Sequence, residues 1–176
     1  TLSSLYIASF ESLKDYIVEN IKTLYKTGFD GENIQYSEDY KTDVKNRHSN
    51  ITMASLFWLK ENGAIDEQDI TIYNSLRLYR NKLAHELMNL MFEGLAEMLP
   101  ENFAQLIAFK IKIEKWWIIN IDIPINPDYD SNAEIDESSI VSSTQLFTQV
   151  IFDMLLGNEK EANFYRNYII EKLNNK

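Results

Sequence analysis

The sequence contains no cysteine. A disulfide framework, a thiolate nucleophile and a thiolate metal site are therefore excluded. Glycine and proline are scarce as well, with five and three residues in a chain of 176. Because tight turns prefer these two residue types, a sandwich or barrel of many short strands would lack the turns it needs. These absences predict a mostly helical protein with few, long elements.

Basic residues are also in deficit. The chain has 17 Lys and Arg against 27 Asp and Glu, a net charge of −10. Sequence-blind binding to nucleic acid depends on cations that neutralise phosphates, so this balance disfavours it but leaves room for a small basic site. No uncharged run reaches the roughly 18 residues that a membrane span requires. We therefore expect a cytoplasmic protein that does not enter a membrane.

The spacing of apolar residues predicts an all-α fold, an up-and-down bundle of about five to six helices in a single domain over residues 1–176. We expect connections at residues 28–40 and in the acidic stretch 126–142. We expect residues 114–125 to pass from a helix end into an extended segment, because Trp and Ile favour strands. The expected helices cover 2–26, from Thr42 or Asp43 to 62, from Asp66 to about 98, about 101–119, from Ser142 or Ser143 through Leu155, and 162–173.

The helix that begins near Asp66 carries an anomaly. Its apolar stripe contains Tyr73, Leu76, Leu83, Leu87 and Met91. Arg80 falls inside that stripe when residues are placed at about 100° intervals. A guanidinium does not lose its proton, and burying it costs on the order of several kcal/mol unless an anion or a carbonyl receives it. A nearby acid such as Asp66 or Asp69 is one candidate partner, and a bound phosphate is another.

A second face of the same helix holds Asn81 and His85, four residues apart, together with Leu78, Met88 and Phe92. A helix that is apolar on two sides packs against its own core and against another surface. Arg80 and His85 are about 140° apart around the helix, so their Cβ atoms diverge. Either the long Arg80 side chain wraps around the helix, or a second copy of the chain supplies the missing group across a two-fold interface.

The string Arg80-Asn81-Lys82-Leu83-Ala84-His85 resembles the Arg-x4-His signature of the HEPN superfamily, and the helical setting resembles that family too. The resemblance extends over about residues 1–120, with residues 140–174 as a helical elaboration. HEPN domains are typically helical bundles, often dimers, and many are metal-independent ribonucleases of toxin–antitoxin, phage-defence or RNA-processing systems. The resemblance therefore implies a homodimer with an RNA substrate, a composite site, no cofactor or metal, and an antitoxin or regulatory protein as a further partner.

The same resemblance implies roles for individual residues. Arg80 and His85 are the catalytic candidates, and Asn81 is the polar residue that orients them. Arg77 and Lys82 are expected to bind the RNA. A ribose 2′-hydroxyl would attack the adjacent phosphate, with His85 as general acid or base and Arg80 stabilising the charge on the phosphate oxygens. Some HEPN toxins carry a modified Tyr two residues after the His; Leu87 stands there in this chain, so that modification is not expected.

Two other hypotheses remain open: a non-catalytic HEPN-like module that binds a nucleotide or a protein partner, and a helical interaction protein whose motif match is accidental. Other clusters have simpler explanations. Lys41, Lys45, Arg47 and His48 are expected at a solvated helix end, with RNA phosphates as the alternative ligand. Trp116 and Trp117 are interpreted as core or dimer packing rather than as a platform for bases. With two histidines and no His-Glu-x-x-His spacing, no metal site is predicted.

Overall fold

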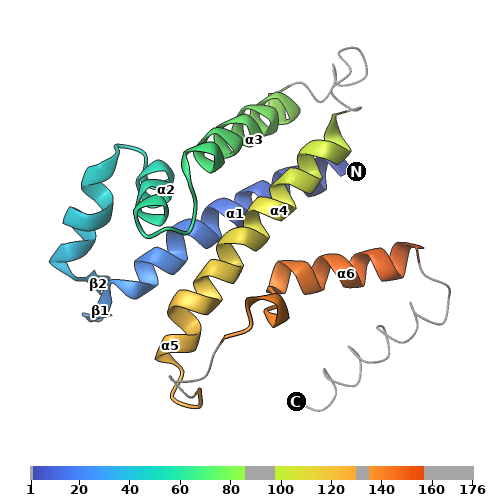
Figure 1. The fold of residues 1–176 in the computed structure, drawn as a ribbon. Helices are drawn as coiled ribbons and strands as arrows, with labels where there is room; N and C mark the ends of the chain where they lie inside the picture. Colours follow the sequence, from blue (N-terminus) through green and yellow to red (C-terminus); the bar gives the residue numbers. More distant parts are fainter. Residues whose placement is uncertain (1, 86–97, 130–134, 157–176) are drawn as a thin grey trace. The chain divides into compact units, whose positions relative to one another are not determined.

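A computed structural model describes residues 2–85, 98–129 and 135–156 (Figure 1). These residues are mostly helical, which confirms the all-α class, with one small two-stranded sheet that the sequence did not predict. The chain divides into two compact units, Thr1–Ile113 and Glu114–Lys176. Each unit is described by itself below.

The first unit is built around three long helices. These are α1 (Leu2–Leu24), α3 (Glu67–His85) and the part of α4 (Leu99–Trp117) that ends at Ile113, and they are joined by the shorter α2 (Ile51–Glu61). Figure 1 shows α3 running in the opposite direction to α1 and α4. The contacts agree, because the Tyr6 hydroxyl near the start of α1 donates to the Leu76 carbonyl at 3.1 Å, whereas Phe10, one turn later, stacks on the earlier Tyr73.

Apolar side chains at helical spacing fill the space between these helices. On the first helix, apolar residues at helical spacing are buried at Tyr6, Phe10, Leu13, Ile17 and Ile21, while Leu24, which continues the spacing, is 41% exposed. Burial of this stripe removes apolar surface from water, which is the main stabilising term of the fold. The largest fully buried side chains of the unit are Tyr6, Leu13, Ile17, Ile21, Val44, Leu56, Leu59, Leu76, Leu83, Leu106 and Ile113.

The segment between α1 and α2 differs from the prediction. Residues expected to form a plain connection make an antiparallel hairpin, β1 (Lys26–Phe29) with β2 (Ile34–Tyr36), whose turn places Gly31 at a φ of +100°. A π-helical turn (Tyr40–Val44) and a 3-10 turn (Lys45–Arg47) follow. The predicted start of the second helix at Thr42 or Asp43 is therefore wrong.

Helix α2 begins instead at Ile51, because Asn50 provides the cap. The Asn50 side chain accepts a hydrogen bond from the backbone N–H of Met53 at 3.1 Å, which satisfies one of the donors that a helix start leaves unpaired. The hydroxyl of Thr42 donates to the Asp39 carbonyl and to Asp43 rather than capping a helix. The end of α2 matches the prediction, with Gly63 in the left-handed region at a φ of +77°.

The start of α3 near Asp66 is confirmed. The backbone N–H of Asp69 donates to the Asp66 carboxylate at 2.9 Å, and the N–H of Asp66 donates to the Asp69 carboxylate at 2.8 Å. This reciprocal pair satisfies two donors at the helix start. Pro100 lies in the first turn of α4, where a proline needs no N–H partner. The predicted third helix extends to about residue 98, and its part over residues 86–97 falls outside the described residues.

In the second unit, helical backbone continues where an extended segment was predicted. α4 ends at Trp117, which confirms the predicted helix end, but a π-helical turn (Ile118–Asp122) and the short α5 (Ile123–Ile125) follow, so the predicted extended segment is wrong. Pro124 is tolerated because it lies in the first turn of α5. A 3-10 turn (Glu137–Ser139) precedes α6 (Ser143–Leu156). The predicted helix at 162–173 lies outside the described residues.

Two buried groups fix the start of α6: the Ser142 hydroxyl, one of the two predicted caps, and the Glu114 carboxylate, which the sequence did not predict. The Ser142 hydroxyl accepts from the N–H of Gln145 at 3.1 Å. The Glu114 carboxylate, only 4% exposed, accepts from the N–H of Thr144 at 3.0 Å and from its hydroxyl at 2.6 Å. An acid at a helix N-terminus also interacts favourably with the helix dipole.

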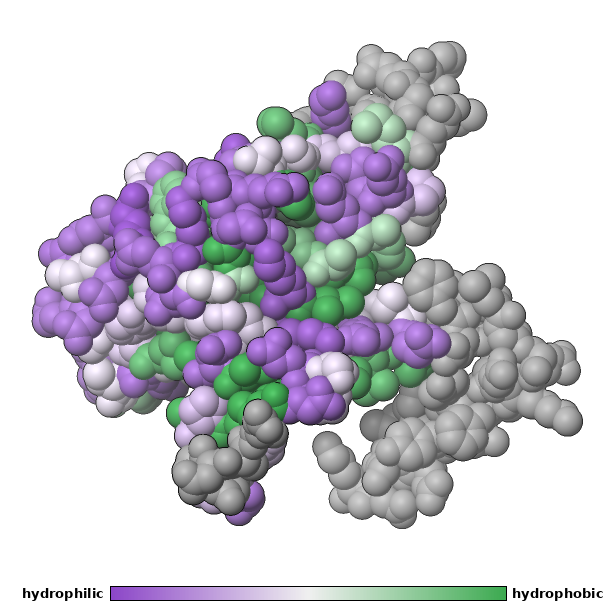
Figure 2. All heavy atoms as spheres, viewed as in Figure 1, coloured by the Kyte–Doolittle hydropathy of each residue, from purple (hydrophilic) through white to green (hydrophobic). Residues whose placement is uncertain are grey.

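The described surface is mainly polar. On the face drawn in Figure 2, hydrophilic residues cover most of the described area, and hydrophobic residues form smaller patches between them. Within the described ranges, no helix combines the length and the apolar character needed to cross a bilayer.

Candidate functional site

The apolar stripe of α3 faces the core as predicted. Tyr73, Leu76 and Leu83 are buried, with exposed fractions of 2%, 0% and 0%. Leu87 and Met91, the remaining members, fall outside the described residues. Leu78, on the second face, is 57% exposed in the single chain. The helix thus presents one apolar side to the bundle and at least one large apolar side chain away from it.

Arg80 receives a carboxylate, but not one of the two that its position suggested. Its Nη2 atom lies 2.6 Å from Oε1 of Glu11 on α1, and the two side chains are 29% and 33% exposed. Asp66 and Asp69 serve a different cation, since Asp69 accepts from Lys112 of α4 at 2.5 Å. The reason is distance along the helix. Asp66 and Asp69 lie at the start of α3, at least three turns before Arg80, whereas Glu11 lies beside Arg80 on the neighbouring helix α1.

Asn81 holds the other side of the guanidinium. Its side-chain oxygen accepts a hydrogen bond from Nη1 of Arg80 at 3.3 Å. Among the described residues, the Nε atom of Arg80 is buried and has no hydrogen-bond partner. The Arg80 head group is therefore positioned by Glu11 and Asn81 while retaining one donor that the described part of the protein does not use.

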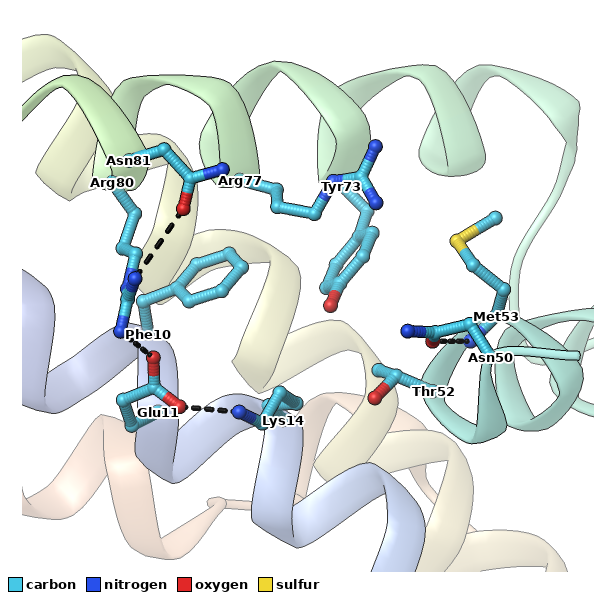
Figure 3. A pocket seen from close by; sticks show the side chains of 10 residues that line it. All are labelled: Phe10, Glu11, Lys14, Asn50, Thr52, Met53, Tyr73, Arg77, Arg80 and Asn81. Atoms are coloured by element: carbon cyan, nitrogen blue, oxygen red, sulfur yellow. Dashed lines mark hydrogen bonds and ion pairs between the residues drawn. The ribbon is translucent and has the colours of Figure 1, made fainter.

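Arg80 and Asn81 open onto a pocket of about 210 Å³. Three helices form it, and Figure 3 shows their side chains converging on a common space. Helix α1 supplies Phe10, Glu11 and Lys14; the start of α2 supplies Asn50, Thr52 and Met53; helix α3 supplies Tyr73, Arg77, Arg80 and Asn81. Three of these lining side chains are cationic and one is anionic, so the pocket carries a local charge of about +2 in a chain whose total is −10.

The charges inside the pocket are ordered. Lys14 donates to Glu11 at 2.5 Å, so Glu11 lies between Lys14 and Arg80. The hydrogen bond from Lys14, with the positive charges of Lys14 and Arg80, holds the pKa of the Glu11 carboxyl below its usual range. Arg77 makes no ion pair with any described residue and is exposed at the pocket wall. The uncompensated positive charge thus lies toward the α2 side of the pocket.

Tyr73 brings a hydroxyl to the same space. Its ring stacks on Phe10, with centroids 5.6 Å apart, and contacts Phe109. Figure 3 shows the hydroxyl pointing into the pocket. Burial raises the pKa of Tyr73 to about 12, so the group is a protonated donor at neutral pH. It makes no hydrogen bond to any described residue.

The structure brings together three of the five predicted site residues. Arg77, Arg80 and Asn81 line the pocket, whereas Lys82 is exposed on α3 and does not line it. The backbone of His85 is helical at the last residue of α3, and its side chain lies outside the described part of the structure. Its catalytic role therefore stays a prediction.

The prediction missed the residues that other helices contribute. Glu11 and Lys14 stand three apart on one helix, which signals an ion pair but not that Arg80 joins it. Asn50 precedes an apolar run and is a recognisable cap, yet its position beside α3 depends on tertiary packing. Tyr73 was identified only as a core residue.

The other clusters are resolved as follows. Lys41, Lys45 and His48 are exposed, while Arg47 pairs with Glu61 at 2.5 Å, so the cluster is a solvated turn region rather than a helix start. Trp117 is 6% exposed, which confirms packing for that residue. The described ranges hold no group of three or more acidic, imidazole or thiolate side chains that could bind a metal ion.

The comparisons with known proteins do not identify a family for this chain. The chain matches no protein-family model, no curated protein and no solved structure. The resemblance to HEPN proteins is therefore carried by residues 80–85 and their helical setting.

Proposed function

We propose that this protein is a metal-independent endoribonuclease of the HEPN type, which cleaves RNA by attack of a 2′-hydroxyl on the adjacent phosphate. One observation carries the proposal. Arg80 and Asn81, the first two residues of the motif, open onto a pocket with three cations and one anion. In an acidic protein, such a local excess of positive charge favours an anionic ligand, and a phosphate is the anion that the motif requires.

Each residue has a task in this chemistry. Arg80 binds the phosphate oxygens through the Nη donors that Glu11 and Asn81 leave unused. Asn81 keeps the guanidinium in place from its other side. His85 takes the proton from the 2′-hydroxyl or gives one to the leaving 5′-oxygen, since an imidazole titrates near neutral pH. The products are a 2′,3′-cyclic phosphate and a 5′-hydroxyl end.

A homodimer would complete this arrangement. Positions 80 and 85 are about 140° apart around α3. Glu11 holds the Arg80 head group toward α1, so the long side chain does not wrap around the helix. A second copy would then bring His85 to Arg80 across a two-fold axis. The exposed Leu78, two turns before His85 on α3, is available for such a contact.

The cleavage test uses RNA in excess EDTA with wild type, Arg80→Lys and His85→Ala, and with Lys26→Ala as control. Lys26 is an exposed cation of β1 outside the pocket. Wild type and Lys26→Ala are expected to cleave, whereas the other two lose about 100-fold or more of the rate. Equal cleavage by all four would refute the roles of Arg80 and His85.

The dimer is tested by mixing Arg80→Ala with His85→Ala. If each site takes Arg80 from one chain and His85 from the other, half of the dimers are mixed and one of their two sites is intact. About a quarter of wild-type activity should then return. No recovery, in a mixture shown by light scattering to be dimeric, would contradict the shared site.

A second function is favoured by the pairing of Arg80 with Glu11, because this pair partly neutralises the guanidinium. In that case the protein is a non-catalytic module that binds a nucleotide in the same pocket. Binding of a nucleotide to wild type, together with no cleavage of any RNA, would select this alternative.

The first proposal also includes a toxin–antitoxin or phage-defence setting, with an antitoxin as partner. This setting is tested by whether expression of the active chain alone stops growth.

A further inference from the structure

The α2 side of the pocket contains groups that the cleavage step does not use. Tyr73 and Thr52 are more than nine-tenths buried, with exposed fractions of 2% and 6%. Both line the pocket, and neither hydroxyl makes a hydrogen bond to any described residue. Neither hydroxyl oxygen is fully enclosed by the protein, so a ligand in the pocket can reach both of them. Figure 3 shows the Tyr73 hydroxyl aimed at the space between Lys14 and Thr52, where a ligand would satisfy it.

The start of helix α2 contributes to the same pocket lining. Helix α2 begins at Ile51, and the Asn50 side chain occupies only the N–H of Met53. The N–H groups of Ile51 and Thr52 precede the first intrahelical bond, so they have no helical acceptor. The N-terminus of a helix also carries about half a positive charge. A helix start beside an unpaired hydroxyl on a largely buried side chain is a suitable place for an anion.

The charges define which anion fits. Glu11 and Arg80 form one balanced pair at the α1 side of the pocket. Lys14 also pairs with Glu11, so the three cations and one anion leave the lining with a net charge of about +2, and Arg77 is its cation without an ion pair to a described residue. A phosphate monoester carries about −1.5 to −2 at pH 7, whereas a diester within an RNA strand carries only one negative charge. The excess of about two positive charges in the pocket lining matches a monoester better than a diester.

We propose that Tyr73, Thr52, Lys14, Arg77 and the first turn of α2 form a binding site for a phosphate monoester. The ligand is the terminal phosphate of an RNA strand or of a nucleotide, or free phosphate, which share this chemistry. The inference goes beyond the proposed ribonuclease function, because it assigns a ligand to residues that the cleavage step leaves idle. Binding measurements alone test this inference, whether or not the protein cleaves RNA.

The experiment measures binding by calorimetry to the full chain. Its probes are inorganic phosphate, adenosine 5′-monophosphate, adenosine, and 3′,5′-cyclic adenosine monophosphate, whose phosphate is a diester. Phosphate and the 5′-monophosphate are expected to bind, while adenosine and the cyclic diester bind at least tenfold more weakly. Preference for the 5′-monophosphate over phosphate assigns the site to a nucleotide or RNA end, and the reverse assigns it to free phosphate. Equal binding of all four compounds, or no binding of phosphate and the 5′-monophosphate, would overturn the proposal.

The variants locate the site. Tyr73→Phe removes one hydroxyl and keeps the ring stack on Phe10, and it should raise the dissociation constant for phosphate roughly tenfold or more. Because that hydroxyl has no partner in the described protein, the melting temperature should not fall. Arg77→Gln should weaken binding roughly fivefold, and less so at high salt. Lys26→Gln is the control that removes a charge outside the pocket. Unchanged affinity in both pocket variants, with both folded, would contradict the assignment.

Discussion

Replacing Glu11 by Gln should move stability and anion affinity in opposite directions. Glu11 is the only acidic side chain in the lining of the pocket, and it pairs with Arg80 at 2.6 Å and with Lys14 at 2.5 Å. Glutamine keeps the size of the side chain and removes its charge. The protein loses two ion pairs, while the pocket gains one unit of net positive charge.

The size of each effect follows from exposure and distance. The three paired side chains are 29–39% exposed, so the pairs are neither fully solvated nor buried. Ion pairs at the surface contribute up to about 1 kcal/mol and charged hydrogen bonds about 1.5–3, so we expect the free energy of unfolding to fall by roughly 1–2 kcal/mol. One added charge near a solvated ligand is worth about 1 kcal/mol, so phosphate should bind roughly fivefold more tightly.

The assay combines urea unfolding with phosphate calorimetry, and Glu19→Gln is the matched control. Glu19 lies on the same helix and pairs with Lys22 at the same i,i+3 spacing, but it is 63% exposed and outside the pocket. The control should change stability by less than about 0.5 kcal/mol and leave phosphate affinity unchanged. If Glu11→Gln weakens phosphate binding, or behaves like Glu19→Gln in both assays, the assigned electrostatics are wrong.

The pH dependence of the same variant gives a second check. The pKa of Glu11 lies below its usual 4.5, first because Lys14 donates a hydrogen bond to it. A lowered folded-state pKa gives stability that is present above the unfolded pKa and lost as the pH falls through the folded one. The stability difference between wild type and Glu11→Gln should therefore be constant at neutral pH and shrink below about pH 4.5. A difference that grows in acid would refute this.

Three further predictions concern the fold, each read from urea denaturation. Glu114→Ala should lower the free energy of unfolding by about 2–3 kcal/mol, because it removes a buried acceptor from the start of α6. Thr144→Val keeps the backbone donor and should lower it by about half as much. Equal losses for the two variants would argue against the shared cap. Asn50→Ala should cost about 1 kcal/mol and Asn50→Asp much less, as expected for a helix cap. Tyr6→Phe should cost about 1 kcal/mol by removing the hydrogen bond from the buried hydroxyl to the Leu76 carbonyl, and no cost would mean that this bond contributes no net stability.

The sequence predicted the helices well where local signals were strong. The apolar stripe of α1, the reciprocal Asp66–Asp69 start of α3 and the serine cap of α6 each depend on residues close in the chain. The failures have a common cause. Thr42 and Asp43 are good capping types, yet packing of Tyr40 and Val44 into the core draws that segment into irregular turns. At residues 114–125, strand propensity lost to the continuation of helical backbone.

The candidate site was predicted in part for the same reason. Arg80 was recognised as a charge in an apolar stripe, and the need for an anionic partner was correct. The partner itself, Glu11, is 69 residues away in the sequence, and only tertiary packing brings it close. The same holds for Asn50 and Thr52, which the irregular turns before α2 carry to the side of α3. Residues on one helix share a face by periodicity, but a pocket between three helices has no local signature.

The chemistry of the cleaved ends tests the central claim most directly. Wild-type protein is incubated in EDTA with an RNA and with the same RNA carrying a single 2′-deoxynucleotide at the mapped cleavage position. We expect the all-ribose strand to yield a 2′,3′-cyclic phosphate and a 5′-hydroxyl end, and the 2′-deoxy strand to remain intact at that position. Cleavage of the 2′-deoxy strand at the same rate, or no cleavage of the all-ribose strand under any condition in which phosphate binds, would contradict the account.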